Sequence, residues 1–240
     1  MTRVNTGAST TSIALPAALS LIAGVTDVTS WLLLGGFFSA HVTGNLVVVA
    51  ADVVTGRAPN LAAVLAIPVF ILTTAAATVV ARSLAERGRA SGVTLVLLGA
   101  QSLLLVAAAT LSFTARASAD PSAPIAIVIG LCAVCAMAAQ TAYLHLVPPK
   151  AASTGVMTGN LVAATVALVD LVLRGGRAVD ARGQWRATWP LLAGFVGGCL
   201  VGAAGASAFS DRAAVIPAAL ATILFAVVVV RRDAPGRPDR

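Results

Sequence analysis

The tripeptide Thr-Gly-Asn occurs twice in this sequence, as Thr43-Gly44-Asn45 and as Thr158-Gly159-Asn160. Each copy comes directly before an apolar run, so each is expected to start a helix. Asparagine is a favoured helix N-cap, because its side-chain oxygen accepts a hydrogen bond from the N–H two or three positions on. Glycine lets the backbone turn tightly and lets a ligand come close. We therefore predict that Asn45 and Asn160 cap two short helices whose positive ends attract an anion, a carboxylate or water.

These two helix starts have a functional and a structural interpretation. In the functional interpretation, Asn45 and Asn160, each with the Thr and Gly before it, line a central pathway for a small solute or ion. In the structural interpretation, the asparagines only satisfy helix ends against neighbouring helices. The repetition of the motif favours the functional interpretation, since an unsatisfied polar group in lipid is costly.

A carboxyl group lies within the first apolar segment. Asp27 is flanked there by the hydroxyl side chains of Thr26, Thr29 and Ser30. An aspartate at a membrane centre costs about 2.5–3.5 kcal/mol on insertion scales, so Asp27 is predicted to face the protein interior. Two roles remain open for it. It couples to a proton or cation, or it is a buried carboxyl that bonds a nearby backbone group or hydroxyl.

His41 and Gln140 complete the candidate pathway residues. His41 comes two residues before the first tripeptide, and Gln140 is the approximate counterpart of Asp27 in the second half. His41 is interpreted either as a gate or proton relay, or as an ordinary hydrogen-bonding residue beside a helix start. Gln140 cannot titrate, so any proton role belongs to the first half.

Other polar residues are predicted to stabilise the bundle. Gln101 is expected to bond across helices, as are three threonines of the second apolar segment, Thr73, Thr74 and Thr78. Two aspartates are expected to reach solvent or to pair with a following arginine, Asp52 with Arg57 and Asp170 with Arg174. Cys132 and Cys135 are interpreted as small apolar residues rather than as a redox or metal pair.

One apolar segment carries glycine at every fourth position, at Gly194, Gly198 and Gly202. Small residues with this spacing let helix backbones approach each other closely. The stripe predicts helix packing within one chain, and the alternative is a contact in a homodimer.

The composition is that of an integral membrane protein. Hydrophobic residues make up 58% of the chain and charged residues 10%, with a mean hydropathy of +0.94. Soluble domains carry about 25% charged residues, so this chain has too few charges to cover a surface in water. The lipid bilayer is therefore its expected partner. The net charge of +7 comes mostly from arginines in short loops and the tail, which form no basic stripe, so nucleic acid is excluded as a partner.

The predicted fold is all-α, with six membrane spans and two short Thr-Gly-Asn helices. The spans are expected at residues 12–34, 61–81, 92–113, 124–146, 189–209 and 213–230. The two short helices, 45–54 and 160–173, would be about 15–21 Å long, which is less than the ~30 Å hydrocarbon core. They are therefore predicted to be re-entrant rather than to cross.

The arginines favour this topology over eight full crossings. With six spans and the N-terminus inside, thirteen of the sixteen Lys and Arg residues lie on the inner side; with eight spans, eleven do. Inner loops of membrane proteins are enriched in these cations. We therefore predict a cell membrane protein with both termini in the cytoplasm, and eight spans remain the alternative.

The order of elements is the same in the two halves, which predicts a two-fold internal repeat. The repeats are placed at residues 1–114 and 115–232, followed by a disordered tail at 233–240. Three spans per half would make the repeat inverted, as in many transporters.

Several motifs together resemble the YoaK family of small bacterial membrane proteins, a domain of unknown function. They are Ala23-Gly24-Val25-Thr26-Asp27, Gly35-Gly36-Phe37-Phe38-Ser39-Ala40-His41-Val42-Thr43-Gly44-Asn45 and Met157-Thr158-Gly159-Asn160. The resemblance covers about residues 13–230. The family pattern often has Gly-Leu-Gln in the fourth span, where this chain has Ala138-Ala139-Gln140. The resemblance implies a fold of six to eight membrane helices and no established activity.

These observations favour a small secondary transporter or channel-like permease for an unidentified solute or ion. The alternative is a non-transporting membrane scaffold in which the same polar groups only lock helices together. We expect no enzyme activity, because the sequence has no hydrolase elbow, zinc-protease motif or phosphate loop. No cofactor and no metal site are predicted.

Overall fold

The structure, a computed structural model, describes residues 10–147, 157–174 and 179–233, and these residues form helices and loops without a strand. The α-helices are α1 (Thr10–Leu33), α2 (Gly44–Val54), α3 (Leu61–Glu86), α4 (Gly92–Ala115), α5 (Pro124–Leu146), α6 (Met157–Arg174), α7 (Val179–Phe209) and α8 (Val215–Asp233). Two 3₁₀ turns, η1 (Ala117–Ala119) and η3 (Ser210–Ala214), connect α4 with α5 and α7 with α8. The predicted tail lies outside the described residues, apart from its first residue at the end of α8.

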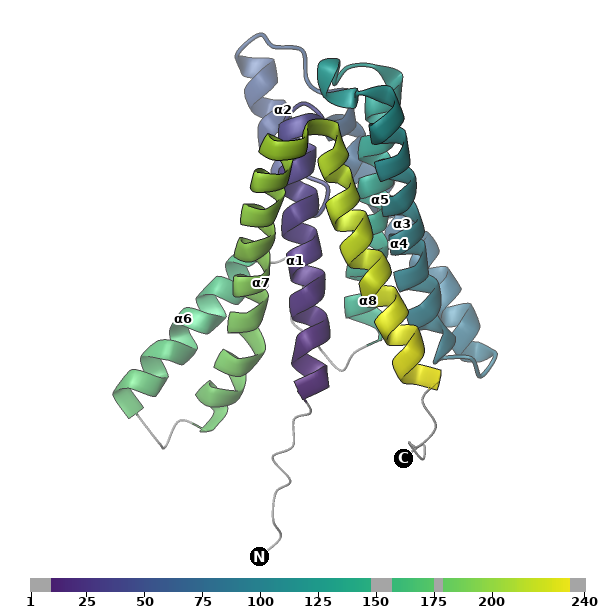
Figure 1. Cartoon of the computed structure of the whole chain (residues 1–240). Coiled ribbons are helices and arrows are strands. Elements are labelled where there is room, and N and C mark those ends of the chain that lie inside the picture. The colour runs from purple at the N-terminus through teal and green to yellow at the C-terminus, as the bar shows by residue number, and fades with distance from the viewer. Residues whose placement is uncertain (1–9, 148–156, 175–178, 234–240) are drawn as a thin grey trace, which may run out of the picture.

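The long helices form an elongated bundle, and α1 begins at the same end of it at which α8 ends (Figure 1). Helix α1 packs mainly against α7, α3 packs against α5, and α4 packs against α5 and α8. Helix α6 packs against α7 and points away from the bundle with its later turns (Figure 1). The all-helical class predicted from the sequence is confirmed.

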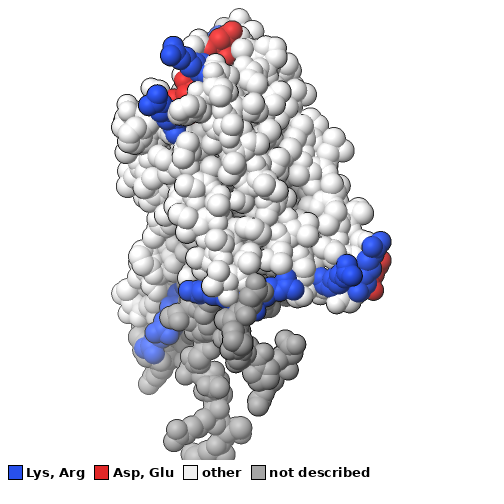
Figure 2. Space-filling view, turned by 45° about the vertical axis from the view of Figure 1, so that its right-hand side comes forward, with Lys and Arg blue, Asp and Glu red and all other residues white. Residues whose placement is uncertain are grey.

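Five helical stretches of the described chain are long and apolar enough to cross a membrane. They are Ala14–Leu33, Leu61–Glu86, Gly92–Ala115, Pro124–Leu146 and Asp180–Arg232, the last of which runs through α7 and α8. Figure 2 shows charged side chains at the two ends of the molecule and a broad band without them in between. Large apolar side chains such as Leu103 (73% exposed) lie on the outside, as expected for contact with lipid.

Two helices extend beyond the segments predicted from hydropathy. Helix α3 continues to Glu86, and α7 begins at Val179 rather than at residue 189. The additional turns carry charged residues such as Asp180 and Arg186. Hydropathy detects only the apolar part of a helix, so it misses turns that continue beyond the lipid.

The glycine stripe packs α7 against α1 within one chain. A Cβ atom added at Gly194 or Gly198 would collide with the carbonyl oxygen of Ala17 or Leu21, and one at Gly202 would lie 3.0 Å from that of Val25. The packing interpretation of the stripe is therefore confirmed. Because these three positions are occupied by α1, the stripe is not available to a second copy of the chain.

A loop between α1 and α2, residues 34–43, folds back into the bundle. It starts with two glycines of positive φ, Gly35 (86°) and Gly36 (80°), a conformation that other residues rarely adopt. Phe37 then packs onto Gly130 of α5 with none of its surface exposed. We call this segment the re-entrant loop. Irregular backbone is tolerated at such depth only where protein buries it and supplies its hydrogen bonds.

Asn60 fastens the beginning of the re-entrant loop. Its side-chain oxygen caps α3 by accepting from the N–H of Ala62 at 2.8 Å. Its amide nitrogen donates to the carbonyl oxygens of Leu34 (2.8 Å) and Gly35 (3.0 Å). One side chain therefore holds the end of α1 and the start of α3 together.

The predicted N-caps are wrong in both halves. Helix α2 begins at Gly44 with Thr43 as N-cap, without a side-chain capping bond, so Asn45 is already inside the helix. Helix α6 begins at Met157, so Asn160 is its fourth residue. In the first half, the physical reason is that the amide of Asn45 is engaged by the re-entrant loop instead of by its own helix.

Candidate functional site

Asp27 organises the deepest part of the re-entrant loop. Its Oδ1 atom accepts from the backbone N–H groups of Ser39 (2.8 Å) and Ala40 (2.6 Å), and its Oδ2 atom accepts from that of His41 (3.3 Å). The carboxyl is 3% exposed and lies six residues, or about 9 Å, before the end of α1. The loop therefore returns almost two helical turns into the bundle, and Asp27 supplies the acceptors that its backbone lacks.

Asp27 also pairs with the imidazole of His41. The Nδ1 atom of His41 lies 2.6 Å from Oδ2 of Asp27, a short, charge-assisted hydrogen bond. When the carboxyl is ionised it can only accept, and Nδ1 then carries the proton of this bond. The other ring nitrogen, Nε2, is buried and has no hydrogen-bond partner among the described residues. The ring lies edge-on to Phe195 of α7, with 4.8 Å between centroids.

Two serine hydroxyls continue the contacts of Asp27 on the other side. Ser39 Oγ donates to Asp27 Oδ1 at 3.3 Å, and Ser30 Oγ donates to Ser39 Oγ at 3.2 Å. Ser30 is 2% exposed and Ser39 is fully buried. Ser30, Ser39, Asp27 and His41 thus form a continuous hydrogen-bonded row, which we call the Asp27 chain.

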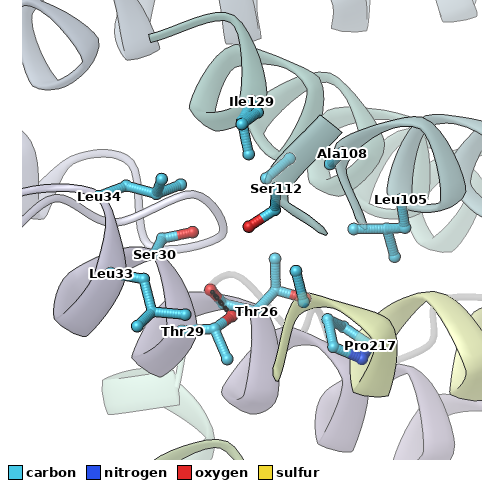
Figure 3. A pocket seen from close by; sticks show the side chains of 12 residues that line it. Thr26, Thr29, Ser30, Leu33, Leu34, Leu105, Ala108, Ser112, Ile129 and Pro217 are labelled. Carbon is cyan, nitrogen blue, oxygen red and sulfur yellow. Dashed lines mark hydrogen bonds between the residues drawn. The ribbon is translucent and has the colours of Figure 1, made fainter. Parts of the chain in front are cut away.

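A small cavity meets the Asp27 chain at Ser30. It has a volume of about 30 Å³ and lies between α1, α4, α5 and α8, with walls that include Leu105, Ile129 and Pro217 (Figure 3). That volume is enough for one or two water molecules. Four hydroxyl groups line it, those of Thr26, Thr29, Ser30 and Ser112.

The cavity hydroxyls present mainly acceptor lone pairs. Thr26 donates to the carbonyl oxygen of Ile22 (2.7 Å), and Thr29 donates to that of Val25 (2.9 Å). Ser112 donates to the carbonyl oxygen of Asp211 at 3.0 Å. A hydroxyl has one proton to donate and two lone pairs, so the remaining lone pairs suit a water molecule or a cation.

Asn45 holds the re-entrant loop rather than facing a pathway. Its Oδ1 atom accepts from the N–H of Phe38, and its Nδ2 atom donates to the carbonyl oxygen of Phe38, both at 2.8 Å. The residue is fully buried. Gly44 lies directly beneath the Phe38 ring, where a Cβ atom would approach to 2.9 Å, while Thr43 is exposed. These contacts of Asn45 and Gly44 with Phe38 support the structural interpretation of the first tripeptide.

The second tripeptide has different surroundings. Asn160 is 7% exposed and its amide lies 3.9 Å from the sulfur of Met157, whereas Thr158 and Gly159 are exposed. Helix α6 runs along α7, with Ala167 and Leu171 in one cluster with Ala181 and Trp185. Whether the two tripeptides meet at one site stays a prediction.

Gln140 lies away from Asp27. Its Oε1 atom accepts from Gln101 of α4 at 2.8 Å, and its Nε2 atom donates to the carbonyl oxygen of Leu19 at 3.1 Å. Leu19 is eight residues, or about 12 Å, along α1 from Asp27. The cross-helix bond predicted for Gln101 is confirmed, and Gln140 ties three helices together.

The remaining polar predictions have mixed outcomes. The pair Asp52–Arg57 is confirmed at 3.2 Å, while the Arg174 side chain lies outside the described residues. Thr73 bonds across helices to the sulfur of Cys135 at 3.3 Å, but Thr78 bonds to its own helix. Cys132 and Cys135 are free thiols. Among the described residues, no three His, Cys, Asp or Glu side chains are grouped to hold a metal.

Sequence reasoning missed Ser39, Phe37 and Asn60, because their roles depend on contacts with distant residues. One signal was present. Gly35-Gly36 directly follows the first span, and consecutive glycines allow positive φ values, which favours a tight turn at this point of the chain.

Comparison with known proteins identifies the family without assigning an activity. No curated protein and no solved structure matches this chain. A family model described as "Protein of unknown function (DUF1275)" matches residues 15–227, and the YoaK name suggested by the motifs is not confirmed by this match. Because the match extends from α1 into α8 and includes the whole Asp27 chain, the protein belongs to the DUF1275 family.

Proposed function

We propose that this protein is a small secondary transporter or channel-like permease for a small solute or ion. The observation that carries the proposal is the Asp27–His41 pair beside a hydroxyl-lined cavity, with the Asp27 carboxyl buried in an apolar bundle and the His41 side chain 24% exposed. A carboxyl in a membrane is costly, and such residues mark ion and substrate pathways in membrane proteins. A bundle held only by packing needs neither a titratable pair nor a polar cavity.

The second half contributes to the proposed pathway through the start of α6. Met157 precedes Ala167 by ten residues, and Phe195 follows Trp185 by ten, about 15 Å in each case. Since Ala167 and Trp185 belong to one cluster and α6 runs antiparallel to the first half of α7 (Figure 1), the start of α6 lies about level with Phe195. The ring of Phe195 contacts His41. This supports a central site to which Asn160 and its tripeptide also belong.

We further propose six crossings, by α1, α3, α4, α5, α7 and α8, with α2 and α6 as short re-entrant helices. The stretch Asp180–Arg232 reverses direction at η3, which makes α7 and α8 two crossings (Figure 1). An inverted repeat is supported by the exchange of partners between halves, α1 with α7 and α3 with α5. The arginine distribution supports a plasma-membrane location with both termini in the cytoplasm.

A scaffold function is the second candidate, and specific contacts favour it. Both groups of the Asn45 amide bond Phe38, and Gln140 bonds Gln101 and Leu19, so these polar residues already have protein partners. In a scaffold, Asp27 would serve only to hold the re-entrant loop through its hydrogen bonds. The two candidates therefore differ in whether Asp27 has a role beyond holding the loop.

The test is a comparison of small-solute and ion uptake in cells that express the wild type, Asp27→Asn or Asp52→Asn. The Asp52 variant is a matched control, because it makes the same substitution in a pair whose arginine is 70% exposed. We expect at least one solute whose flux depends on the wild type, is lost in Asp27→Asn and is kept in Asp52→Asn. Identical flux profiles for the wild type and a folded Asp27→Asn protein would favour the scaffold.

A further inference from the structure

The Asp27 chain connects two different surroundings. At one end, Ser30 lines the cavity between α1, α4, α5 and α8 (Figure 3). At the other end, His41 lies against Phe195 of α7, and its Nε2 atom has no partner in the described part of the chain. Between them, each neighbouring pair of side chains is within hydrogen-bond distance.

We propose that the Asp27 chain conducts protons to the Asp27 carboxyl from either end, so that the proton is the coupling ion of this protein. A coupling ion presupposes the proposed transport function, so the inference rests on that function. It adds to the proposed function the identity of the ion and two further residues, Ser30 and Ser39. Proton binding at Asp27 itself does not require a transported solute.

The hydroxyl bonds have the direction that loading from the cavity needs. A hydronium ion in the cavity gives a proton to Ser30 Oγ and leaves as water. The Ser30 proton passes to Ser39 Oγ, and the Ser39 proton passes to Oδ1 of Asp27. The balance is one hydronium converted to water and one carboxylate converted to a neutral carboxylic acid.

Loading from the other end uses both ring nitrogens of His41. A hydronium ion that reaches Nε2 gives it a proton, which forms the imidazolium and leaves water, and the Nδ1 proton then passes to Oδ2 of Asp27 over the 2.6 Å bond. The imidazole is left neutral, with its proton on Nε2. The product at Asp27 is the same as for loading from the cavity, so one carboxyl is reached from two sides.

Binding of a proton to Asp27 changes the net charge of the site, because few other titratable groups of the described chain lie near the carboxyl. Of the groups that face Asp27, His41 comes from the re-entrant loop and the thiol of Cys199 comes from α7, within electrostatic range. In the described chain, His41 is the ion-pair partner of Asp27, and the Asp52–Arg57 pair is at the surface. No described arginine or lysine pairs with Asp27.

Protonation would also loosen the loop that Asp27 holds. Hydrogen bonds to a carboxylate are stronger than those to a neutral acid, and Asp27 accepts three of them from the backbone of Ser39, Ala40 and His41. Neutralising Asp27 weakens all three together. The bound proton is thereby linked to the position of the re-entrant loop, which is the kind of link that coupled transport needs.

The first experiment measures proton flux into liposomes that contain the purified protein and a pH-sensitive dye, with a potassium diffusion potential as the driving force. Ser39→Ala removes the relay hydroxyl and keeps the backbone N–H that bonds Asp27, so it tests conduction with little effect on folding. We expect at least a tenfold loss of flux in Asp27→Asn and Ser39→Ala, on the general scale of proton-relay losses. Ser102→Ala is the matched control, because Ser102 is a buried serine that bonds Thr222 and lies outside both the cavity and the Asp27 chain.

The second experiment needs no flux. The protein has two histidines, so in a His145→Gln background the ¹⁵N resonances of the remaining imidazole report the protonation of His41. We expect Asp27→Asn to shift the Nδ1 resonance of His41, because the carboxylate oxygen 2.6 Å from this nitrogen is lost.

The outcomes separate this inference from the proposed function. Wild-type flux that survives both Ser39→Ala and Asp27→Asn, or a His41 Nδ1 resonance unaffected by Asp27→Asn, overturns the proton inference while solute transport can still stand. Proton flux with the expected variant losses, together with an empty solute screen, supports proton conduction and removes the solute from the proposed function.

Discussion

The two Thr-Gly-Asn copies have the same sequence and different surroundings. In the first half, the tripeptide follows a re-entrant loop, and Asn45 is fully buried with both ends of its amide bonded to Phe38. In the second half, Asn160 is 7% exposed, lies near Met157 and belongs to a helix that packs against α7. The tripeptide alone therefore does not determine what its asparagine does.

The difference arises because, among the described residues, only the first half has a carboxyl that accepts hydrogen bonds from the backbone in front of the tripeptide. Asp27 supplies acceptors to the N–H groups of Ser39, Ala40 and His41, so a loop can be held inside the bundle. Gln140, the approximate counterpart of Asp27 predicted from the sequence, bonds Gln101 and Leu19. The titratable centre thus belongs to the first half, and the second half supplies packing through α7 and the start of α6.

The largest effect is expected for Asp27→Ala. The substitution leaves three buried backbone N–H groups, the Ser39 hydroxyl and the His41 ring without their acceptor. We expect a loss of about 3–5 kcal/mol, the range for breaking a buried ion pair. Thermal unfolding of the purified protein in detergent micelles measures it. Gln140→Ala should cost less, about 1–3 kcal/mol, and equal losses at both positions would contradict the assignment of the centre to the first half.

The next effect compares the two asparagines directly. Asn45→Ala leaves the N–H and the carbonyl of Phe38 without partners, for an expected cost of about 2–4 kcal/mol. Asn160→Ala should cost about 1 kcal/mol. Unfolding midpoints of the two variants under the same conditions check the order. A larger loss at Asn160 would show that the second tripeptide carries the tighter contacts.

A smaller effect is expected where the halves join, between α1 and α7. Gly198→Ala places a methyl group against the Leu21 backbone, which should cost about 1–3 kcal/mol through overpacking. Gly197 is one residue away and has open space at its Cβ position, so Gly197→Ala is the matched control and should be neutral or slightly stabilising. Equal thermal stability of the two variants would mean that α1 and α7 separate readily.

The smallest effect is expected at the surface of the first half. Asp52→Asn removes the pair with Arg57, whose side chain is 70% exposed. Exposed ion pairs contribute about 0–1 kcal/mol and are screened by salt. We expect an unfolding midpoint close to that of the wild type at high salt, and a large shift there would place Asp52 in a less solvated position than its partner indicates.

The helices could be predicted from the sequence, and the re-entrant loop could not. Continuous apolar runs predicted α4 and α5 to within two residues at their ends, because lipid demands long apolar stretches. The burial of Asp27 and Asn45 could also be predicted, because a polar side chain exposed to lipid costs free energy. Their partners did not, since Asp27 bonds a loop 12 to 14 residues away and Asn45 bonds Phe38 across a turn. Local capping rules gave Asn45 the wrong partner, because the buried backbone of Phe38 competes for the same amide.

Asn60 connects the beginning of the re-entrant loop with the beginning of α3, a helix on the outside of the bundle. Its side chain bonds the carbonyl groups of Leu34 and Gly35, directly after α1, and, with its oxygen, the first turn of α3. A shift of the loop would therefore pull on the beginning of α3, a helix with large apolar side chains such as Leu72 and Val79 on its lipid-facing surface. In the same way, any change that moves the beginning of α3 would act on the two hydrogen bonds that hold the start of the loop.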